Sequence, residues 1–420
     1  MSEKLLNLWR RVFRLPPFTA YLVAVACWFF PFGLQTTIFP GVINYTLNEP
    51  ADRLGLAQAA LTAPMLFLLP LTGVLAERLD RRFVMSGFHL QAALAAGILA
   101  YLMFAGLLNY WTMVAFALVA GTASAFVLPA RDSAVNPVTR VVQRLGKRDL
   151  TLQKAVILTS LVQFAAQICG MGAGFLAGVF GPAPLFALQA GVLLIGAGAA
   201  LSMPRMHTHR TEHAPILQSL GEGIKTVVAS SVLMPMTLIM MAVGFFIVGG
   251  GFFVIVPVLV RDGYDGGYGL LALLMIAFWV GALLANIILA RIGSIERPGL
   301  VVMVAQFVTV FAIGLLAIPL PLMLLFALVL AWGLGGGVAI SLSRSVIQEQ
   351  APAHQLARVM SVYQLGLFGG MPAGAFAMGF VVAEIGARPA ALIPMFGFLF
   401  VLIAICVFTP ILKVRRVESH

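Results

Sequence analysis

The chain has 420 residues, of which 61% are hydrophobic and 10% charged, and its formal net charge is +11. Soluble domains carry about 25% charged residues, so this composition excludes a soluble fold. The positive charge would suit a nucleic-acid partner, but the distribution of the basic residues argues against nucleic-acid binding.

Apolar runs long enough to cross a bilayer follow one another along the whole chain. A helix needs about 20 mostly apolar residues to span the hydrocarbon core, and its backbone polar groups must be bonded internally. The predicted spans are residues 18–43, 54–76, 83–107, 110–130, 152–179, 184–203, 233–260, 268–290, 300–318, 321–342, 359–382 and 390–412. We therefore predict an all-α membrane protein with twelve transmembrane helices.

The basic residues fix the expected orientation. If the amino terminus is cytoplasmic, all 26 Lys and Arg residues except Arg53, Arg261 and Arg388 fall in or beside cytoplasmic segments. Such an excess is what the positive-inside rule describes, so we expect both termini in the cytoplasm. The positive charge then sets the orientation of the chain in the membrane. It also gives some attraction to anionic membrane lipids, and we expect no nucleic-acid role. The very short outer loops favour a bacterial inner (plasma) membrane.

A polar connector divides the chain into two predicted halves. Residues 1–203 form an N-terminal six-helix bundle, 204–231 a cytoplasmic linker, and 232–420 a C-terminal six-helix bundle. Within the linker, residues 216–228 have the pattern of an amphipathic helix that lies on the membrane surface. The linker histidines His207, His209 and His213 have no Cys nearby, which favours a solvated linker over a metal site. We expect no metal and no cofactor.

Glycines at matching places indicate an internal repeat. They recur every four residues in the fifth span of each half, at Gly170, Gly174, Gly178 and at Gly366, Gly370, Gly374. Alone, this spacing indicates close helix packing. A similar cytoplasmic passage precedes each set, 131–137 in one half and 344–352 in the other. Such repeats predict two pseudo-symmetric six-helix bundles with a substrate site near the midplane between them.

The connector between the second and third spans carries the most specific motif. It reads Gly73-Val-Leu-Ala-Glu77-Arg78-Leu-Asp80-Arg81-Arg82. This resembles the signature loop of the major facilitator superfamily, G-x-L-a-D-R-x-G-R-R/K, although Glu77 replaces the usual Asp and Asp80 a common Gly. Residues 219–225 and 344–363 resemble the enterobactin-exporter-like branch of that superfamily.

The resemblance implies a cytoplasmic gate. In the family the acidic position contacts the start of span eleven and a basic residue that ends span four. Carried over, Glu77 would meet residues 355–359, with Arg131 as the cation. The implied gate comprises Gly73, Glu77, Arg78, Asp80, Arg81, Arg82 and Arg131. As an alternative, the arginines of the loop only enforce topology; the two roles are compatible.

Polar and aromatic residues at mid-span are candidates to line the substrate cavity. They are Trp28, Phe32, Gln35, Gln163, Gln167, Trp279, Asn286 and Trp332. Aromatic walls with few amides suit a large amphipathic solute. For each residue alone, interhelical packing or bonding is an equally good explanation.

Ionisable groups are scarce inside the spans, with no Asp or Glu near the middle of any. The coupling candidates are His89 in span three and Asp132 at the inner end of span four, because ionisable groups in hydrocarbon are usually functional. For His89, a hydrogen-bonded structural role is the favoured alternative. The usual basic signature near the start of span four has no counterpart in residues 110–121, so proton coupling is implied mainly by the resemblance.

The resemblance and the span pattern together predict a secondary active transporter. It would be a monomeric, proton-driven antiporter that exports a hydrophobic or amphipathic small molecule, of siderophore or drug type, by alternating access. A lipid or lysolipid flippase and a solute uptake symporter are the alternatives. No catalytic constellation and no phosphate-binding loop are found, so we expect neither an enzyme nor direct ATP coupling. A receptor that binds ligand without transport is a further alternative.

Overall fold

The chain is all-helical wherever the structure describes it. The computed structural model describes residues 16–145, 150–205, 216–292, 295–352 and 355–414, without the side chains of 69–78, 216–217, 219 and 357. Every regular element in these ranges is a helix. The helices form two compact units, Met1–Phe39 with Phe67–His213, and Pro40–Leu66 with Ala214–His420.

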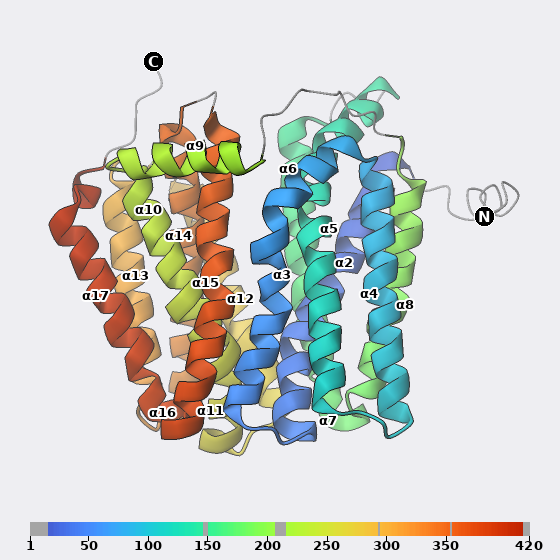
Figure 1. The fold of residues 1–420 in the computed structure, drawn as a ribbon, viewed down its shortest axis with the longest axis vertical. Coiled ribbons are helices and arrows are strands. Elements are labelled where there is room, and N and C mark those ends of the chain that lie inside the picture. The colour runs from blue at the N-terminus through green and yellow to red at the C-terminus, as the bar shows by residue number, and fades with distance from the viewer. Residues whose placement is uncertain (1–15, 146–149, 206–215, 293–294, 353–354, 415–420) are drawn as a thin grey trace, which may run out of the picture. The chain divides into compact units, whose positions relative to one another are not determined.

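The first unit contains the helices of the N-terminal part of the chain (Figure 1). They are α2 (Pro17–Gly41), the second half of α3 (Ala51–Arg78), α4 (Arg81–Phe104), α5 (Tyr110–Arg144), α6 (Leu152–Gly174), the short α7 (Ala177–Phe180) and α8 (Ala183–Ser202). Its core lies where α2, α4, α5 and α8 meet, around Trp28, Met85 and Val127. The core residues are mostly alanine, valine and aromatic side chains, which allows the helices to pack closely.

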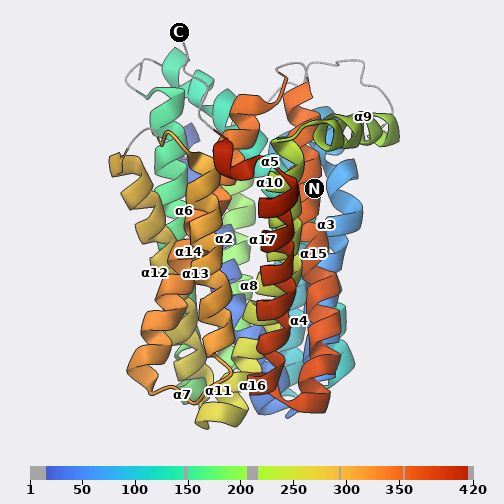
Figure 2. The ribbon, with the colours of Figure 1, turned by 90° about the vertical axis from the view of Figure 1, so that its left-hand side faces the viewer.

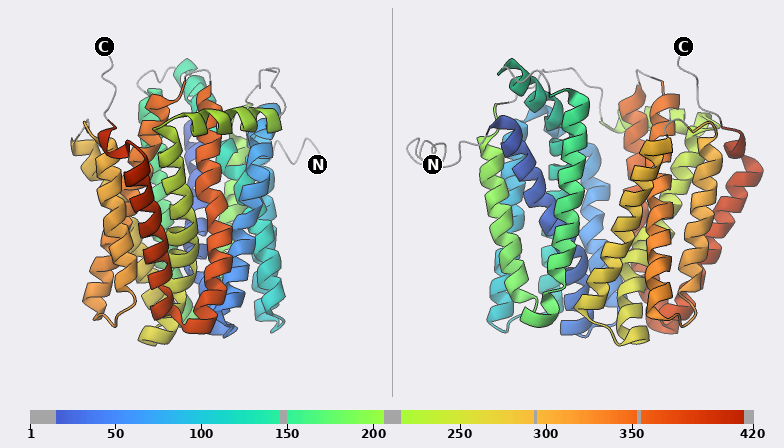
Figure 3. Two further views of the ribbon diagram at one scale, coloured as in Figure 1. Left: turned by 60° about the vertical axis from the view of Figure 1, so that its left-hand side comes forward. Right: turned by 180° about the vertical axis from the view of Figure 1, so that it is seen from behind.

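The second unit contains the later helices, and several of them run lengthwise in Figure 2. Its elements are η1 (Val42–Thr46), the first half of α3, α9 (Ile216–Ala229), α10 (Leu233–Ala242), the π-helix η2 (Val243–Ile255), α11 (Val256–Tyr264), α12 (Tyr268–Ile292), α13 (Pro298–Leu315), α14 (Leu322–Gln350), α15 (Leu356–Ile385), α16 (Ala387–Ala390), α17 (Leu392–Phe408) and η4 (Ile411–Lys413). From behind, α12 and α14 run side by side (Figure 3).

Eleven helical stretches among the described residues are long and apolar enough to span a membrane. The predicted second span is α3, a helix of 28 residues that includes side chains outside the description. Two spans extend further than predicted, because α5 continues to Arg144 and α14 to Gln350. The passages 131–137 and 344–352, expected as connectors, are therefore helical over most or all of their length.

The continuation of α5 has a clear physical cause. Pro129 and Pro137 both lie inside the helix, and each removes one backbone hydrogen bond. Ala130, Ala134 and Val138 nevertheless recur at helical spacing and are fully buried in the core of the first unit. Burial of this apolar stripe outweighs the local preference for a break.

The compact units depart from the predicted halves in one segment. Residues 40–66 precede the predicted boundary by well over a hundred residues, yet they belong to the second unit. Close backbone approaches explain this assignment. A Cβ at Gly55 would lie 2.5 Å from the carbonyl oxygen of Ala375 and 2.7 Å from Gly379 Cα, so α3 and α15 touch through two glycines.

The repeated glycines pack in the same way in both units. A Cβ at Gly170 in α6 would collide with the Phe30 carbonyl of α2, and one at Gly374 in α15 with the Phe245 carbonyl of η2. In each unit the fifth span is thus pressed against the first span of its own half. Within the same rows, a Cβ at Gly174 or Gly370 would also clash with the neighbouring helix. A Cβ at Gly366 would make only ordinary van der Waals contacts.

Gly178 does not belong to this packing row. The helix α6 ends at Gly174, and Gly178 lies in the short α7, where no atom lies within 4 Å of a Cβ position. The four-residue spacing continues in the sequence, but Gly178 lies beyond the end of the packed helix. Its predicted packing role is therefore wrong.

Candidate functional site

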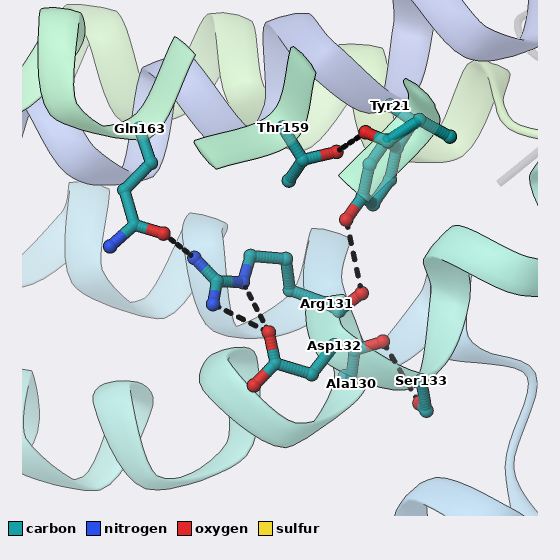
Figure 4. A network of polar contacts seen from close by, with 8 residues as sticks. Tyr21, Ala130, Arg131, Asp132, Ser133, Thr159 and Gln163 are labelled. Atoms are coloured by element: carbon teal, nitrogen blue, oxygen red, sulfur yellow. Dashed lines mark hydrogen bonds and ion pairs between the residues drawn. The ribbon is translucent and has the colours of Figure 1, made fainter. Parts of the chain in front are cut away.

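Arg131 is the centre of a polar network inside the first unit (Figure 4). Its side chain is only 12% exposed and belongs to α5. Nε and Nη2 donate to Asp132 Oδ1 over 2.9 and 2.5 Å, and Nη1 donates to Gln163 Oε1 of α6 over 2.7 Å. The guanidinium therefore joins a carboxylate of its own helix to an amide of the next.

An aromatic wall of α2 completes the surroundings of Arg131. The guanidinium carbon lies 4.8 Å from the centre of the Phe29 ring, at cation–π distance. The hydroxyl of Tyr21, also in α2, donates to the Arg131 carbonyl over 3.3 Å. Three helices of the first unit, α2, α5 and α6, thus converge on one cation.

The two charges of this network differ in their access to solvent. Asp132 is 56% exposed, whereas Arg131 is largely enclosed. A carboxylate can bind and release protons, while a guanidinium stays charged. If Asp132 takes up a proton, Arg131 loses this counter-charge, and its remaining side-chain partners among the described residues are Gln163 and the Phe29 ring. The arrangement can therefore link protonation to the exposure of a positive charge.

The turn between α3 and α4 is anchored to the same part of α5. Asp80 caps α4 by accepting from the Arg82 backbone N over 3.2 Å, and it also pairs with the Arg82 guanidinium at 2.9 Å. Arg81 Nε donates to Ser133 Oγ over 2.9 Å. The departure from the common Gly at position 80 thus supplies a helix cap. The predicted gate residues Gly73, Glu77 and Arg78 lie in the segment 69–78, whose side chains the structure does not describe.

His89 ties α4 to α2. The ring is fully buried, with Nδ1 2.7 Å from the Met85 carbonyl and Nε2 3.2 Å from the Ala24 carbonyl. Trp28 meets the ring edge-on at a centroid distance of 5.0 Å. Both nitrogens face main-chain carbonyls, so the geometry favours the structural alternative for this residue.

The other predicted lining residues of the first unit lie on α2 and α6. Gln35 accepts a hydrogen bond of 3.3 Å from Gln189 Nε2 of α8. Gln167 is buried where Gly33 of α2 touches its backbone, and Phe32 is half-buried. Among the described residues, the Gln167 amide has no hydrogen-bond partner.

The predicted lining residues of the second unit separate into two groups. Trp332 is buried against Phe252 and Phe278, with ring centroids 6.2 and 5.6 Å away, so it fills the interior. Trp279 is half-buried beside the same Phe278 ring. Asn286 links α12 to α14, because Ser341 Oγ donates to its Oδ1 over 2.7 Å.

Sequence reasoning missed a second charged cluster, at Arg261. Arg261 Nε donates to Asp262 Oδ1 over 2.6 Å, and Nη1 donates to the Glu49 carbonyl over 2.9 Å. Nearby, the hydroxyls of Thr46 and Tyr268 are 2.8 Å apart. This cluster holds η1 and the following turn to α11 and α12 within the second unit. Arg261 is one of three cations that break the positive-inside pattern, which was the available signal.

The amphipathic segment 216–228 is helix α9, which lies across the ends of lengthwise helices in its unit (Figure 1). It docks on the start of α15. Glu222 forms an ion pair with Arg358, and Thr226 donates to the Gln355 side chain. The sequence indicated the helix but not this partner. The linker histidines lie outside the described residues.

No group of three metal-ligating side chains occurs among the residues that the structure describes. The polar contacts instead form pairs and short chains that join helices. Such contacts can position helices, hold a solute and exchange a proton.

Comparison with known families identifies the kind of protein that this arrangement belongs to. A family model described as transmembrane secretion effector matches residues 46–419, which is most of the chain. No curated protein sequence matches the chain.

Solved structures of membrane transporters share the fold. The nucleoside transporter NupG superposes with a TM-score of 0.71 at 15% identity, over 94% of this chain and 99% of that one. A structure of a single-residue mutant of NupG gives a TM-score of 0.74 at 14% identity, over 93% and 99%. A bacterial homolog of the human lysosomal transporter Spinster, inward-facing and unoccupied, gives 0.64 at 14% identity, over 97% and 99%. These likenesses confirm the predicted fold.

Proposed function

We propose that this secondary transporter, which belongs to the transmembrane secretion effector family of the major facilitator superfamily, exports a hydrophobic or amphipathic small molecule in exchange for protons. The observation that carries the proposal is the pair of Arg131 and Asp132 within α5. Ionisable side chains within membrane-spanning helices are rare and are retained mainly where they bind or relay charge.

Asp132 is the proposed proton acceptor. With Asp132 ionised, its carboxylate neutralises the enclosed Arg131. Proton uptake would leave Arg131 with the Gln163 oxygen and the Phe29 ring as its remaining side-chain partners among the described residues. The two protonation states therefore favour different environments for α5, which is what coupling to a conformational change requires.

The inner gate is proposed from the anchored turn between α3 and α4. Arg81 bonds to Ser133, two residues beyond Arg131 in the same helix. A movement of α5 would therefore displace this turn. We assign the gate to the motif residues together with Arg131, and propose that Glu77 reaches the start of α15 when that side of the protein closes.

The Arg261 cluster supports a second gate. It lies next to the start of α3, at the opposite end of that helix from the turn between α3 and α4. Residues 40–66 belong to the first repeat by sequence but pack within the second unit through Arg261, Tyr268 and the Gly55–Gly379 contact. Alternating access between repeats would require these contacts to open. Breaking them is thus the expected step for release toward the outside.

The remaining assignments follow from this scheme. We propose a monomer in a bacterial inner membrane with both termini in the cytoplasm. The half-buried Gln35, Gln163 and Trp279 are proposed to face the solute, and the solute is of siderophore or drug type. The family description supports export over uptake.

The experiment uses the purified full-length protein in proteoliposomes with an imposed pH gradient. A panel of fluorescent hydrophobic drugs and ferric siderophores is tested for accumulation. The proposal expects accumulation of at least one compound that is abolished by a protonophore. Accumulation that does not depend on the pH gradient would overturn the proposed proton coupling. Movement of labelled phospholipid or lysolipid instead of these compounds would favour a flippase.

A further inference from the structure

We propose that α9 controls the inner gate by occupying the place on α15 where Glu77 is proposed to dock. While Glu222 of α9 is paired with Arg358, this place is taken, so the gate closes only after α9 releases α15. The proposal rests on the inner gate proposed above and adds the element that regulates its closure.

The start of α15 is a favourable position for a carboxylate. The helix begins at Leu356, and its first backbone N–H groups carry a partial positive charge. Among the described side chains, none caps this end by a hydrogen bond to the backbone. Gln355, at the capping position, instead accepts a hydrogen bond from Thr226 Oγ1 of α9. An acidic side chain is therefore the partner that this end of the helix favours.

Glu222 already brings an acidic side chain to this turn. Its carboxylate forms an ion pair with Arg358, which lies in the first turn of α15. The resemblance to the signature loop places Glu77 at residues 355–359, which is the same turn. Two carboxylates beside one guanidinium repel each other, so this turn favours Glu222 or Glu77 but not both at once.

The main chain of α9 closes off the same face of α15. A Cβ at Gly223 would lie 2.9 Å from the Arg358 carbonyl oxygen and 3.1 Å from Val362 Cγ2. Figure 1 shows α9 crossing the end of α15, and this glycine lies at the contact. The two helices leave no room for a side chain at this point. Glu77 can therefore reach this face of α15 only after α9 has moved away.

The contact between α9 and α15 is suited to repeated release and return. The side chains of Glu222 and Arg358 are 38% and 33% exposed, and exposed ion pairs contribute little to stability. A released α9 also stays near its site, because only three residues separate its last residue, Ala229, from Leu233, where α10 begins. Such a short tether keeps the effective concentration of α9 at α15 high.

The test measures gate closure without any solute, by double electron–electron resonance on the full-length protein in phospholipid nanodiscs. One spin label is attached at Leu79→Cys, in the exposed turn between α3 and α4. The other is attached at Gln348→Cys, on the end of α14 that leads to α15. The native Cys27, Cys169 and Cys406 are replaced by Ala. Closure of the gate shortens the distance between the labels, so the ratio of short-distance to long-distance populations is compared among variants.

Variants that release α9 should raise this ratio. We expect Glu222→Gln to raise it about two- to fivefold, which is the scale of one exposed ion pair. Gly223→Leu should raise it further, because its side chain forces the two helices apart. Lys225→Gln and Gly221→Leu are the matched controls on α9 and should leave the ratio unchanged. Lys225 is exposed, and no atom lies within 4 Å of a Cβ at Gly221.

A Glu77→Gln background separates the role of α9 from the gate itself. Glu77→Gln alone should lower the ratio, and Glu222→Gln should then have no further effect, since α9 acts by excluding Glu77. An unchanged ratio in Glu77→Gln would refute the gate and the role of α9 with it. A lowered ratio there, without a rise in Glu222→Gln or Gly223→Leu, would refute the role of α9 alone. A rise in Glu222→Gln that persists in the Glu77→Gln background would equally refute it.

Discussion

Arg81 and Ser133 are joined by a 2.9 Å hydrogen bond between the start of α4 and the C-terminal half of α5. Ser133 follows the charged pair Arg131–Asp132 in the same helix. The turn that carries the signature motif is therefore fixed to the helix that carries the coupling candidate. This connection gives the proposed gate and the proposed proton site a shared mechanical element.

The first prediction concerns that connection. Replacing Ser133 with Ala should lower the free energy of unfolding by about 1 kcal/mol, the usual loss for one partly buried hydrogen bond. Arg81→Ala should have a similar effect, and the double variant should lose less than the sum of the two. Thermal unfolding of the purified protein measures all three. Strict additivity would show that the bond contributes nothing.

The second prediction concerns Arg131→Lys. An arginine donates to Asp132 and Gln163 at once, and a lysine ammonium cannot reproduce this fork. We expect the variant to fold but to transport at least about tenfold more slowly, which corresponds to the loss of about 1.4 kcal/mol. Gln163→Leu should give a smaller decrease, because the carboxylate contact remains. Transport rates at equal protein density in proteoliposomes test this order.

The third prediction concerns the close glycine contacts. Gly170→Ala and Gly374→Ala each force a Cβ into a backbone carbonyl of the neighbouring helix. The cost should be about 1–3 kcal/mol, as for other overpacked sites. Gly178→Ala is the matched control, since nothing lies within 4 Å of its Cβ position. Equal melting temperatures for all three variants would contradict the packing described here.

The fourth prediction concerns the docking of α9. Glu222→Lys places two cations together at Arg358 and should speed amide hydrogen exchange in residues 216–229. The charge-exchanged double variant with Arg358→Glu should restore protection. The effect should be modest, because the two side chains are 38% and 33% exposed and such pairs contribute about 0–1 kcal/mol. Lys225→Glu, on the exposed side of α9, is the control.

Hydropathy was sufficient to place the spans, because a segment that crosses lipid must bond its backbone polar groups internally, which a helix does. It failed at the end of α5, where the predicted span ended at residue 130 and the charged passage 131–137 was expected to be a cytoplasmic connector. There, burial of Ala134 and Val138 against the first-unit core decides the structure, and burial depends on partners distant in sequence. The Gly178 prediction failed for another reason. Its four-residue spacing matched the row, but helix α6 ends at Gly174.

The polar site was only partly predictable. Arg131, Asp132 and Gln163 were each singled out, but in different roles, and only the geometry brings them into one network. Arg261 was counted as an exception to the charge rule, and its contacts with Glu49 became visible only in the fold. Spacing reports which residues share a helix face but not which helices meet.

The central claim is that Asp132 couples proton movement to transport. The most direct measurement is the pH change inside pyranine-loaded proteoliposomes when a transported solute is added. The account predicts solute-driven proton movement in the unsubstituted protein and in Asp265→Asn, an exposed control carboxylate. It predicts none in Asp132→Asn, which should still exchange labelled for unlabelled solute. Undiminished proton movement in Asp132→Asn would contradict it.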